Sequence, residues 1–76
     1  MALKRLVQPN SPRIRELREG KDLTQGELAQ RIFRSRHTVW KAENDRLVSK
    51  AVMGQIARAL QTSLADVTVA AEKRAA

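Results

Sequence analysis

The sequence predicts an all-α fold, a compact bundle of five short helices, on three observations. Along most of the chain, apolar residues recur at spacings of three and four, which places them on one face of a helix. A serine or threonine stands immediately before each of these runs, where its hydroxyl oxygen can cap the first turn. No repeat or low-complexity linker interrupts the 76 residues, so we expect one shared core.

The charge of the chain points to a polyanionic partner. Fifteen Lys and Arg residues against eight Asp and Glu residues give a net charge of +7 and a pI near 11.2. A domain this basic commonly binds nucleic acid or an anionic surface. Charge alone does not choose among DNA, RNA and acidic membranes.

Other classes of protein are disfavoured by what the sequence lacks. There is no cysteine and only one histidine, so we expect no disulfide, no metal site and no cofactor. No apolar run approaches the roughly 20 residues that span a bilayer, and the N-terminus lacks the apolar core of a signal peptide. We therefore expect a soluble, cytoplasmic protein that does not bind membranes. Without a glycine-rich phosphate loop or an acidic pair in an apolar setting, we do not expect an enzyme.

The chain is predicted to divide into a basic N-terminal arm over residues 1–10, a helical domain over 11–70 and a C-terminal tail over 71–76. Lys4 and Arg5 make the arm basic, and its proline disfavours a helix there. Two interpretations of the arm are open. It either contacts a polyanion, or it is a mobile or packed tail.

The first helix is predicted to begin at Ser11, whose hydroxyl can cap it. Pro12 fits the first turn, where its missing N–H costs nothing. Ile14 and Leu17 are three residues apart and should face the core. Gly20 is a natural end for this helix.

Residues 25–44 are predicted to form two short helices that share one face, a helix-turn-helix. Thr24 precedes the first of them and Glu27 stands three positions later, so the two side chains can form a capping box. Ser35 can cap the second helix. The residues expected to face the core are Leu28, Ala29 and Ile32 in the first helix and Val39 and Ala42 in the second.

The rest of the domain is predicted to be a connection followed by two more helices. The connection covers residues 45–48, where Asp45 tolerates left-handed backbone geometry. Ser49 is expected to cap the fourth helix and Ser63 the short fifth one. Their core-facing residues are expected to be Val52, Met53, Ile56, Ala59 and Leu60 in the fourth helix and Leu64 and Val67 in the fifth.

The run LTQGELAQ, with Val39 and the pair Glu43 and Asn44 after it, resembles the Cro and repressor class of phage and bacterial helix-turn-helix proteins, the lambda repressor-like XRE family. The likeness extends upstream to Arg18 and downstream through IARALQTSLADV. It implies that Ala29 is the small residue where the motif helices cross and that Val39 is a core residue of the second helix. It also implies that Arg18 pairs with Glu43 and ties the first helix to the end of the motif.

Two residues in the turn of the motif depart from the family. Phe33 stands where the family usually has glycine, because the backbone there often takes a positive φ. Arg34 stands where the family prefers an apolar residue. The sequence therefore predicts either a different turn or a strained backbone at Phe33.

The resemblance implies that the second motif helix enters the major groove of DNA, which admits one α-helix. Arg36, His37 and Lys41 are then assigned to base edges, and the guanidinium of Arg36 can bond to O6 and N7 of guanine. It stays open whether Arg36 holds only a phosphate and whether His37 is a surface residue without a task. The residues assigned to the DNA backbone are Thr24, Gln25, Arg34, Trp40, Asn44 and Arg46.

Two interpretations are open for Trp40. Its ring could rest on a sugar and a thymine methyl group, or its inner edge could pack on Phe33 and the first helix. The gain from burying an aromatic side chain favours the packing.

The resemblance implies a transcriptional regulator that binds double-stranded DNA sequence-specifically, a small Cro-like repressor that reads a pseudo-palindromic operator. It implies a homodimer formed through the C-terminal region, in the cytoplasm of a bacterium or a phage-infected host. Two other functions are open: a protein-interaction module such as an antitoxin or regulator subunit, and an RNA-binding basic domain. The second has few aromatic residues available for stacking on bases.

Overall fold

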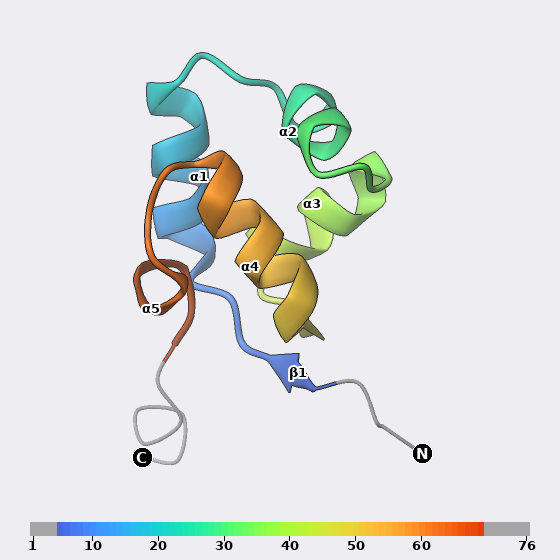
Figure 1. Cartoon of the computed structure of the whole chain (residues 1–76), viewed down its shortest axis with the longest axis vertical. Coiled ribbons are helices and arrows are strands. Elements are labelled where there is room, and N and C mark those ends of the chain that lie inside the picture. Colours follow the sequence, from blue (N-terminus) through green and yellow to red (C-terminus); the bar gives the residue numbers. More distant parts are fainter. Residues whose placement is uncertain (1–4, 70–76) are drawn as a thin grey trace.

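Figure 1 shows the computed structural model of the chain, in which residues 5–69 are described. Lys4 and the predicted tail over 71–76 lie outside this range. Within it, five helices form the domain as predicted, and the domain also contains a short two-stranded sheet. The elements in chain order are β1 (Leu6–Val7), α1 (Ser11–Gly20), α2 (Gln25–Arg31), α3 (Arg36–Glu43), β2 (Val48–Ser49), α4 (Lys50–Ala59) and α5 (Leu64–Val67).

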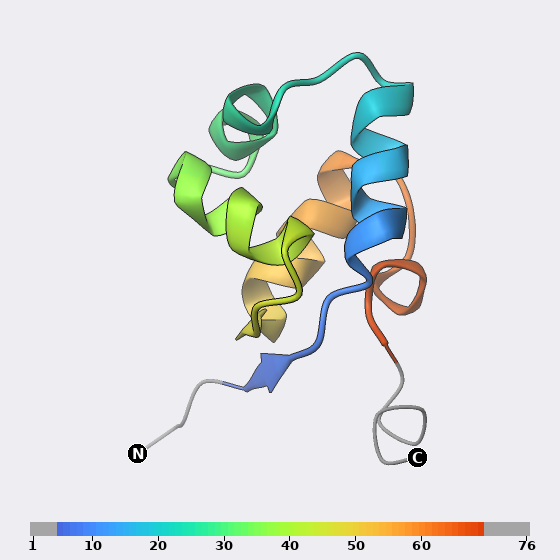
Figure 2. The same ribbon diagram turned by 180° about the vertical axis from the view of Figure 1, so that it is seen from behind.

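The helices surround α4. In Figures 1 and 2, α1 and α5 lie on one side of the domain, α2 and α3 lie on the other, and α4 lies between the two pairs. The strand β1 lies at the end of the domain where α4 begins. This arrangement holds α2 and α3 as an adjacent pair at one side of the molecule.

Four of the five predicted helix caps are confirmed. The Thr24 hydroxyl accepts a hydrogen bond from the Glu27 backbone N–H at 3.0 Å, and the Glu27 carboxylate accepts one from the Thr24 N–H at 2.8 Å, which completes the predicted capping box. Ser35, Ser49 and Ser63 each accept a bond from the backbone N–H three residues later. These caps satisfy N–H groups that the first turn of a helix leaves unpaired.

The prediction that Ser11 caps α1 is wrong. Asn10 is the cap, and its side chain accepts a hydrogen bond from the Arg13 N–H at 3.4 Å. Ser11 is buried instead; its hydroxyl donates to the Ala42 carbonyl at 2.6 Å and accepts from the Asp45 N–H at 2.9 Å. Asparagine caps a helix as well as serine does, so local propensity could not separate the two neighbours.

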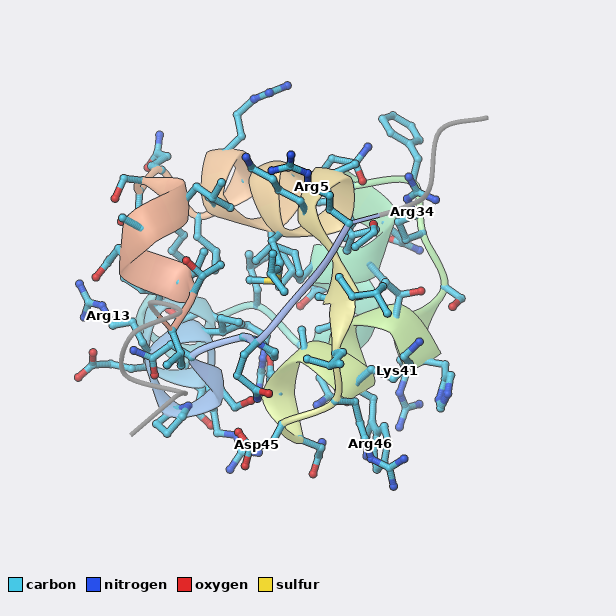
Figure 3. The ribbon with its side chains drawn as sticks, turned by 90° about the horizontal axis from the view of Figure 1, so that it is seen from below. Arg5, Arg13, Arg34, Lys41, Asp45 and Arg46 are labelled. Atoms are coloured by element: carbon cyan, nitrogen blue, oxygen red, sulfur yellow. The ribbon has the colours of Figure 1, made fainter. Side chains whose placement is uncertain are left out.

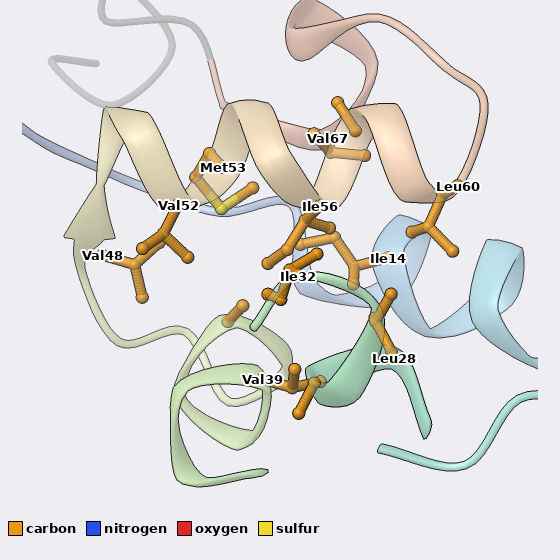
Figure 4. Packing of buried hydrophobic residues seen from close by; sticks show 13 residues of the cluster. Ile14, Leu28, Ile32, Val39, Val48, Val52, Met53, Ile56, Leu60 and Val67 are labelled. Atoms are coloured by element: carbon orange, nitrogen blue, oxygen red, sulfur yellow. The ribbon is translucent and has the colours of Figure 1, made fainter. Parts of the chain in front are cut away.

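One hydrophobic core is shared by all five helices, and Figure 4 shows its packing. Its buried members are Ile14, Leu28, Ala29, Ile32, Val39, Ala42, Val48, Val52, Met53, Ile56, Ala57, Leu60 and Val67. Three residues predicted to face inward, Leu17, Ala59 and Leu64, are only partly buried and pack against this core. Val48, which was predicted to lie in a connection, belongs to β2 and is buried.

The small sheet holds the described part of the predicted arm against the domain. β1 pairs with β2 in antiparallel register, with Leu6 opposite Ser49 and Val7 opposite Val48. Next to this pair, the Lys50 N–H donates to the Arg5 carbonyl at 2.8 Å. At the other end of the segment, the Asn10 N–H donates to the Val67 carbonyl at 2.8 Å. Strands of two residues show no alternation of polar and apolar side chains, so the sequence pattern could not reveal the sheet.

Two left-handed residues flank α3. Asp45 has a φ of 58°, in agreement with the tolerance predicted for aspartate there. Phe33 has a φ of 57°, so the turn keeps the backbone geometry that favours glycine although it carries a bulky side chain. Of the two possibilities predicted for this turn, the strained one is therefore present, at a cost of about 1 to 2 kcal/mol.

Candidate nucleic-acid interface

Helix α3 is attached to the core by one side and exposed on the other. Val39 and Ala42 are completely buried. Arg36, His37 and Trp40 are exposed, and Lys41 is half-buried. Since neighbouring turns of a helix stack at spacings of three and four, burial of one side fixes the direction in which the other points. The exposed side of α3 therefore has a fixed orientation relative to the core.

The inner end of α3 is held by the Glu43 carboxylate, whose side chain is fully buried. The Nε of Arg18 donates to one of its oxygens at 2.6 Å, and Arg18 Nη2 donates to the other at 3.0 Å. The Nε2 of Gln25 donates to that second oxygen at 3.2 Å. A buried carboxylate needs such donors to offset its lost hydration. Hydrogen bonding to Glu43 raises the pKa of the Arg18 guanidinium above its usual value.

Arg15 and Arg18 make further contacts in this network, among them a hydrogen bond of 3.5 Å from Arg15 Nε to Glu43 Oε1. Arg18 Nη1 donates to the Leu23 carbonyl at 2.7 Å, and Arg15 Nη2 donates to the Glu43 carbonyl at 3.2 Å. The network therefore connects α1, the segment before α2 and the end of α3. Sequence reasoning missed the part played by Arg15, although Arg15 lies three residues before Arg18 and hence on the same side of α1.

The residues at the start of α2 are already partly engaged within the protein. Thr24 is occupied by the capping box with Glu27. The amide NH₂ of Gln25 uses one donor on Glu43, which leaves a second hydrogen on the same nitrogen. Gln25 is thereby oriented at the positive end of α2, where helix N–H groups favour an anion.

Three side chains form a stacked row on the outside of α3: His37, Trp40 and Arg46. The His37 and Trp40 rings lie 5.5 Å apart between centroids and are inclined by 12°. The guanidinium carbon of Arg46 lies 5.8 Å from the centroid of the Trp40 ring, within the range of a cation–π contact. His37 and Trp40 meet because residues three apart share a helix face.

The predicted packing of Trp40 on Phe33 is wrong. Phe33 is 92% exposed and Trp40 is 38% exposed, so the tryptophan does not bury its ring against that phenylalanine. Its neighbours are instead His37 and Arg46. The large flat side chain contacts one other exposed ring, that of His37, and the guanidinium of Arg46.

The end of α3 and the turn before it are tied by two further polar contacts. The Asn44 side-chain amide donates to the Trp40 carbonyl at 2.8 Å, which satisfies a carbonyl in the last turn. Arg34 Nε donates to Gln55 Oε1 at 3.1 Å and so links the turn to α4. Both residues are exposed.

A basic groove of about 930 Å³ runs between α3 and α4. Its lining includes the cationic residues Arg5, Arg34, Lys41, Lys50 and Arg58 and contains no Asp or Glu. Figure 3 shows Lys41 at α3, Arg34 beside α4 and Arg5 over α4. Lys41 therefore lies on the flank of α3 beside this groove, whereas Arg36 and His37 belong to its exposed side. Sequence reasoning missed Lys50 and Arg58 and placed Arg5 only in an arm that could contact a polyanion, because no local pattern predicts that the fold brings these three residues together.

Among residues 5–69, no cluster of three or more His, Cys, Asp or Glu side chains could hold a metal ion. In the same part of the chain, no helix has the length and apolar character needed to cross a membrane.

Comparison with known families agrees with this geometry. A sequence model of the family described as "Helix-turn-helix domain" matches residues 12–70, which include α2 to α5 and all of α1 except Ser11. Comparisons with curated proteins and with solved structures found no match. The family match covers well over half of the chain and both helices of the motif. The chain therefore belongs to the helix-turn-helix domain family, consistent with a DNA-binding protein of the Cro and XRE type.

Proposed function

We propose that the protein is a sequence-specific transcriptional regulator, a small Cro-like repressor that places α3 in the major groove of double-stranded DNA. The observation that carries this proposal is the asymmetry of α3. Its buried side is fixed by Val39, Ala42 and the Glu43 network, and its exposed side presents cations without an exposed carboxylate on the helix. Such a surface approaches a polyanion without repulsion, and one α-helix fits the groove.

Base reading is assigned to the residues at the start and along the flank of α3. Arg36 presents a planar fork of donors that suits O6 and N7 of guanine, a pairing worth about 1 to 3 kcal/mol of discrimination. His37 can donate to a base or a phosphate, and its stacking on Trp40 limits its orientation. Lys41 reaches bases from the side that faces the basic groove.

Contacts with the DNA backbone are assigned to residues around α3. Thr24 and Gln25 lie at the positive end of α2, and Gln25 keeps a donor for a phosphate. Arg34, Asn44 and Arg46 surround α3, and Trp40 offers its ring to a sugar. Each neutralised phosphate releases counterions, so we expect the affinity to fall steeply as salt rises.

One such helix reads only a few base pairs, so specificity calls for a homodimer on a pseudo-palindromic site with half-sites about one helical turn apart. We place the dimer contact in the C-terminal region, as the resemblance implies.

The experiment is selection of bound sequences from random duplexes at stated salt concentrations, followed by titration of the selected site with varied half-site spacing. We expect one enriched pseudo-palindrome and a binding optimum near one helical turn. Single-stranded RNA serves as competitor. Equal affinity for selected duplex, random duplex and RNA would contradict the proposal. An affinity that does not change with half-site spacing would contradict the homodimer.

A further inference from the structure

Phe33 stands out among residues 5–69 because two unfavourable features coincide there. Its side chain is 92% exposed, against 55% for Leu6, the next most exposed large apolar residue. Its backbone φ of 57° is one that a bulky side chain rarely adopts. The other left-handed residues, Asp22, Asp45 and Gln61, are all polar. Backbone strain of this kind clusters at active sites, ligand clamps and switch regions.

The surface beside Phe33 is concave and basic. Arg31, Ile32, Phe33, Gln55, Arg58 and Ala59 line a depression of about 300 Å³, which contains no Asp or Glu. Arg31 and Arg58 are exposed, and Arg34 adjoins them through its hydrogen bond with Gln55. A projecting ring thus stands next to a hollow that can receive one apolar side chain, with exposed cations around both.

This surface is separate from the stacked row assigned to DNA. Figure 3 places Arg34 beside α4, whereas Arg46, which belongs to the stacked row, lies at the far end of α3. The depression is formed by the end of α2, the turn before α3 and the second half of α4. A short peptide in the depression would leave the stacked row of His37, Trp40 and Arg46 uncovered, although Gln55 and Arg58 also line the basic groove.

We propose that the Phe33 depression binds a peptide segment of a partner protein that carries an apolar side chain flanked by Asp or Glu. The hollow takes the apolar side chain against the Phe33 ring, and Arg31 and Arg58 pair with the carboxylates. Aromatic and arginine side chains are the residue types that most often dominate protein interfaces. The proposal goes beyond DNA binding, because it gives the domain a second, protein partner.

The charge and the shape of the depression favour an acidic peptide over a second copy of the chain or a membrane surface. A second copy of the chain would bring Arg31, Arg34 and Arg58 against the same cations across a two-fold contact, and like charges oppose that association. A flat membrane surface would make no use of a hollow beside a projecting ring. Acidic residues with an apolar anchor complement both the charge and the shape.

The test uses the full chain and a displayed library of short random peptides. We expect enriched peptides to carry Asp or Glu beside a large apolar residue. NMR shift changes on adding such a peptide should centre on Phe33, Arg58 and Ala59. F33N removes the ring but keeps a residue that tolerates left-handed backbone, and it should weaken peptide binding about tenfold or more. R58E should do the same.

Two matched controls separate local from general effects. L47N removes another exposed apolar side chain, and K21E makes the same charge change on an exposed residue outside the depression. Both should leave peptide affinity within about twofold. Failure to enrich acidic peptides, or unchanged binding by F33N, would overturn the proposal. So would displacement of the peptide by duplex DNA, which would assign the surface to DNA instead.

Discussion

The two ends of α3 are held in opposite ways. At its inner end, the Glu43 side chain is 0% exposed and receives donors from Arg18 and Gln25. At its other end, Phe33 is 92% exposed and strained, and an exposed Arg34–Gln55 hydrogen bond provides the link to α4. This difference shows that the buried contacts of Glu43 fix the direction of α3. The turn before α3 contributes less to that direction and can therefore contain a strained residue such as Phe33.

The largest effect should come from Glu43. E43A leaves the Arg18 guanidinium, whose side chain is 12% exposed, without its carboxylate, so we expect the free energy of unfolding to fall by about 3 to 5 kcal/mol. E19A is the matched control, because the exposed Glu19 lies 3.9 Å from the same arginine. It should cost less than about 1 kcal/mol. If urea unfolding shows that E43A and E19A lower the free energy of unfolding equally, the buried Glu43 network does not stabilise the end of α3 as described.

Replacing Phe33 in the turn by glycine should have the opposite effect and raise the free energy of unfolding. F33G relieves the left-handed strain and forfeits no burial, so it should raise the free energy of unfolding by about 0.5 to 1 kcal/mol after the entropy of the extra glycine is subtracted. F33A keeps a Cβ and therefore most of the strain. Thermal unfolding should rank F33G above F33A and wild type. A destabilised F33G would show that the ring contributes packing in the folded state.

The link between the turn and α4 should matter less. R34A removes one exposed hydrogen bond to Gln55, so we expect a change in stability below about 0.5 kcal/mol. Its effect on DNA affinity should be larger than its effect on folding, because Arg34 also lines the basic groove. Unfolding curves and DNA titrations of the same variant compare the two. A stability loss as large as that of E43A would contradict the contrast between the two ends.

The carboxylate of Asp66 in α5 should contribute to the pH dependence of stability. The Thr62 hydroxyl and Arg13 hold the pKa of Asp66 below its usual value of 3.8. Because the folded pKa is the lower one, the stabilisation is present above pH 3.8 and is lost as pH falls through the folded pKa. D66N should therefore lose a small part of the acid dependence of stability below pH 4, measured by chemical unfolding at several pH values. An unchanged acid profile would show that Asp66 contributes nothing.

Much of this architecture could be predicted from the sequence because it is encoded locally. The capping box of Thr24 and Glu27 and the apolar spacing of α4 each involve residues a few positions apart. The fully buried side of α3, with Val39 and Ala42, follows from the same periodicity.

What could not be predicted depends on contacts between distant segments. Ser11 is recruited to Ala42 and Asp45, which lie more than 30 residues away, instead of capping its own helix. The sheet pairs residues 6–7 with 48–49. The basic groove likewise gathers side chains from β1, α3 and α4, and only the folded chain brings them together.

The base preference of an Arg36 variant tests most directly whether the exposed side of α3 reads base edges as proposed. Selection from random duplexes should show that R36A loses discrimination by about 1 to 3 kcal/mol at one base pair of each half-site. R46A, the matched loss of a cation assigned to phosphate, should weaken binding to all sequences alike and lower the salt dependence. If R36A keeps the wild-type preference at every position, α3 does not read DNA as proposed.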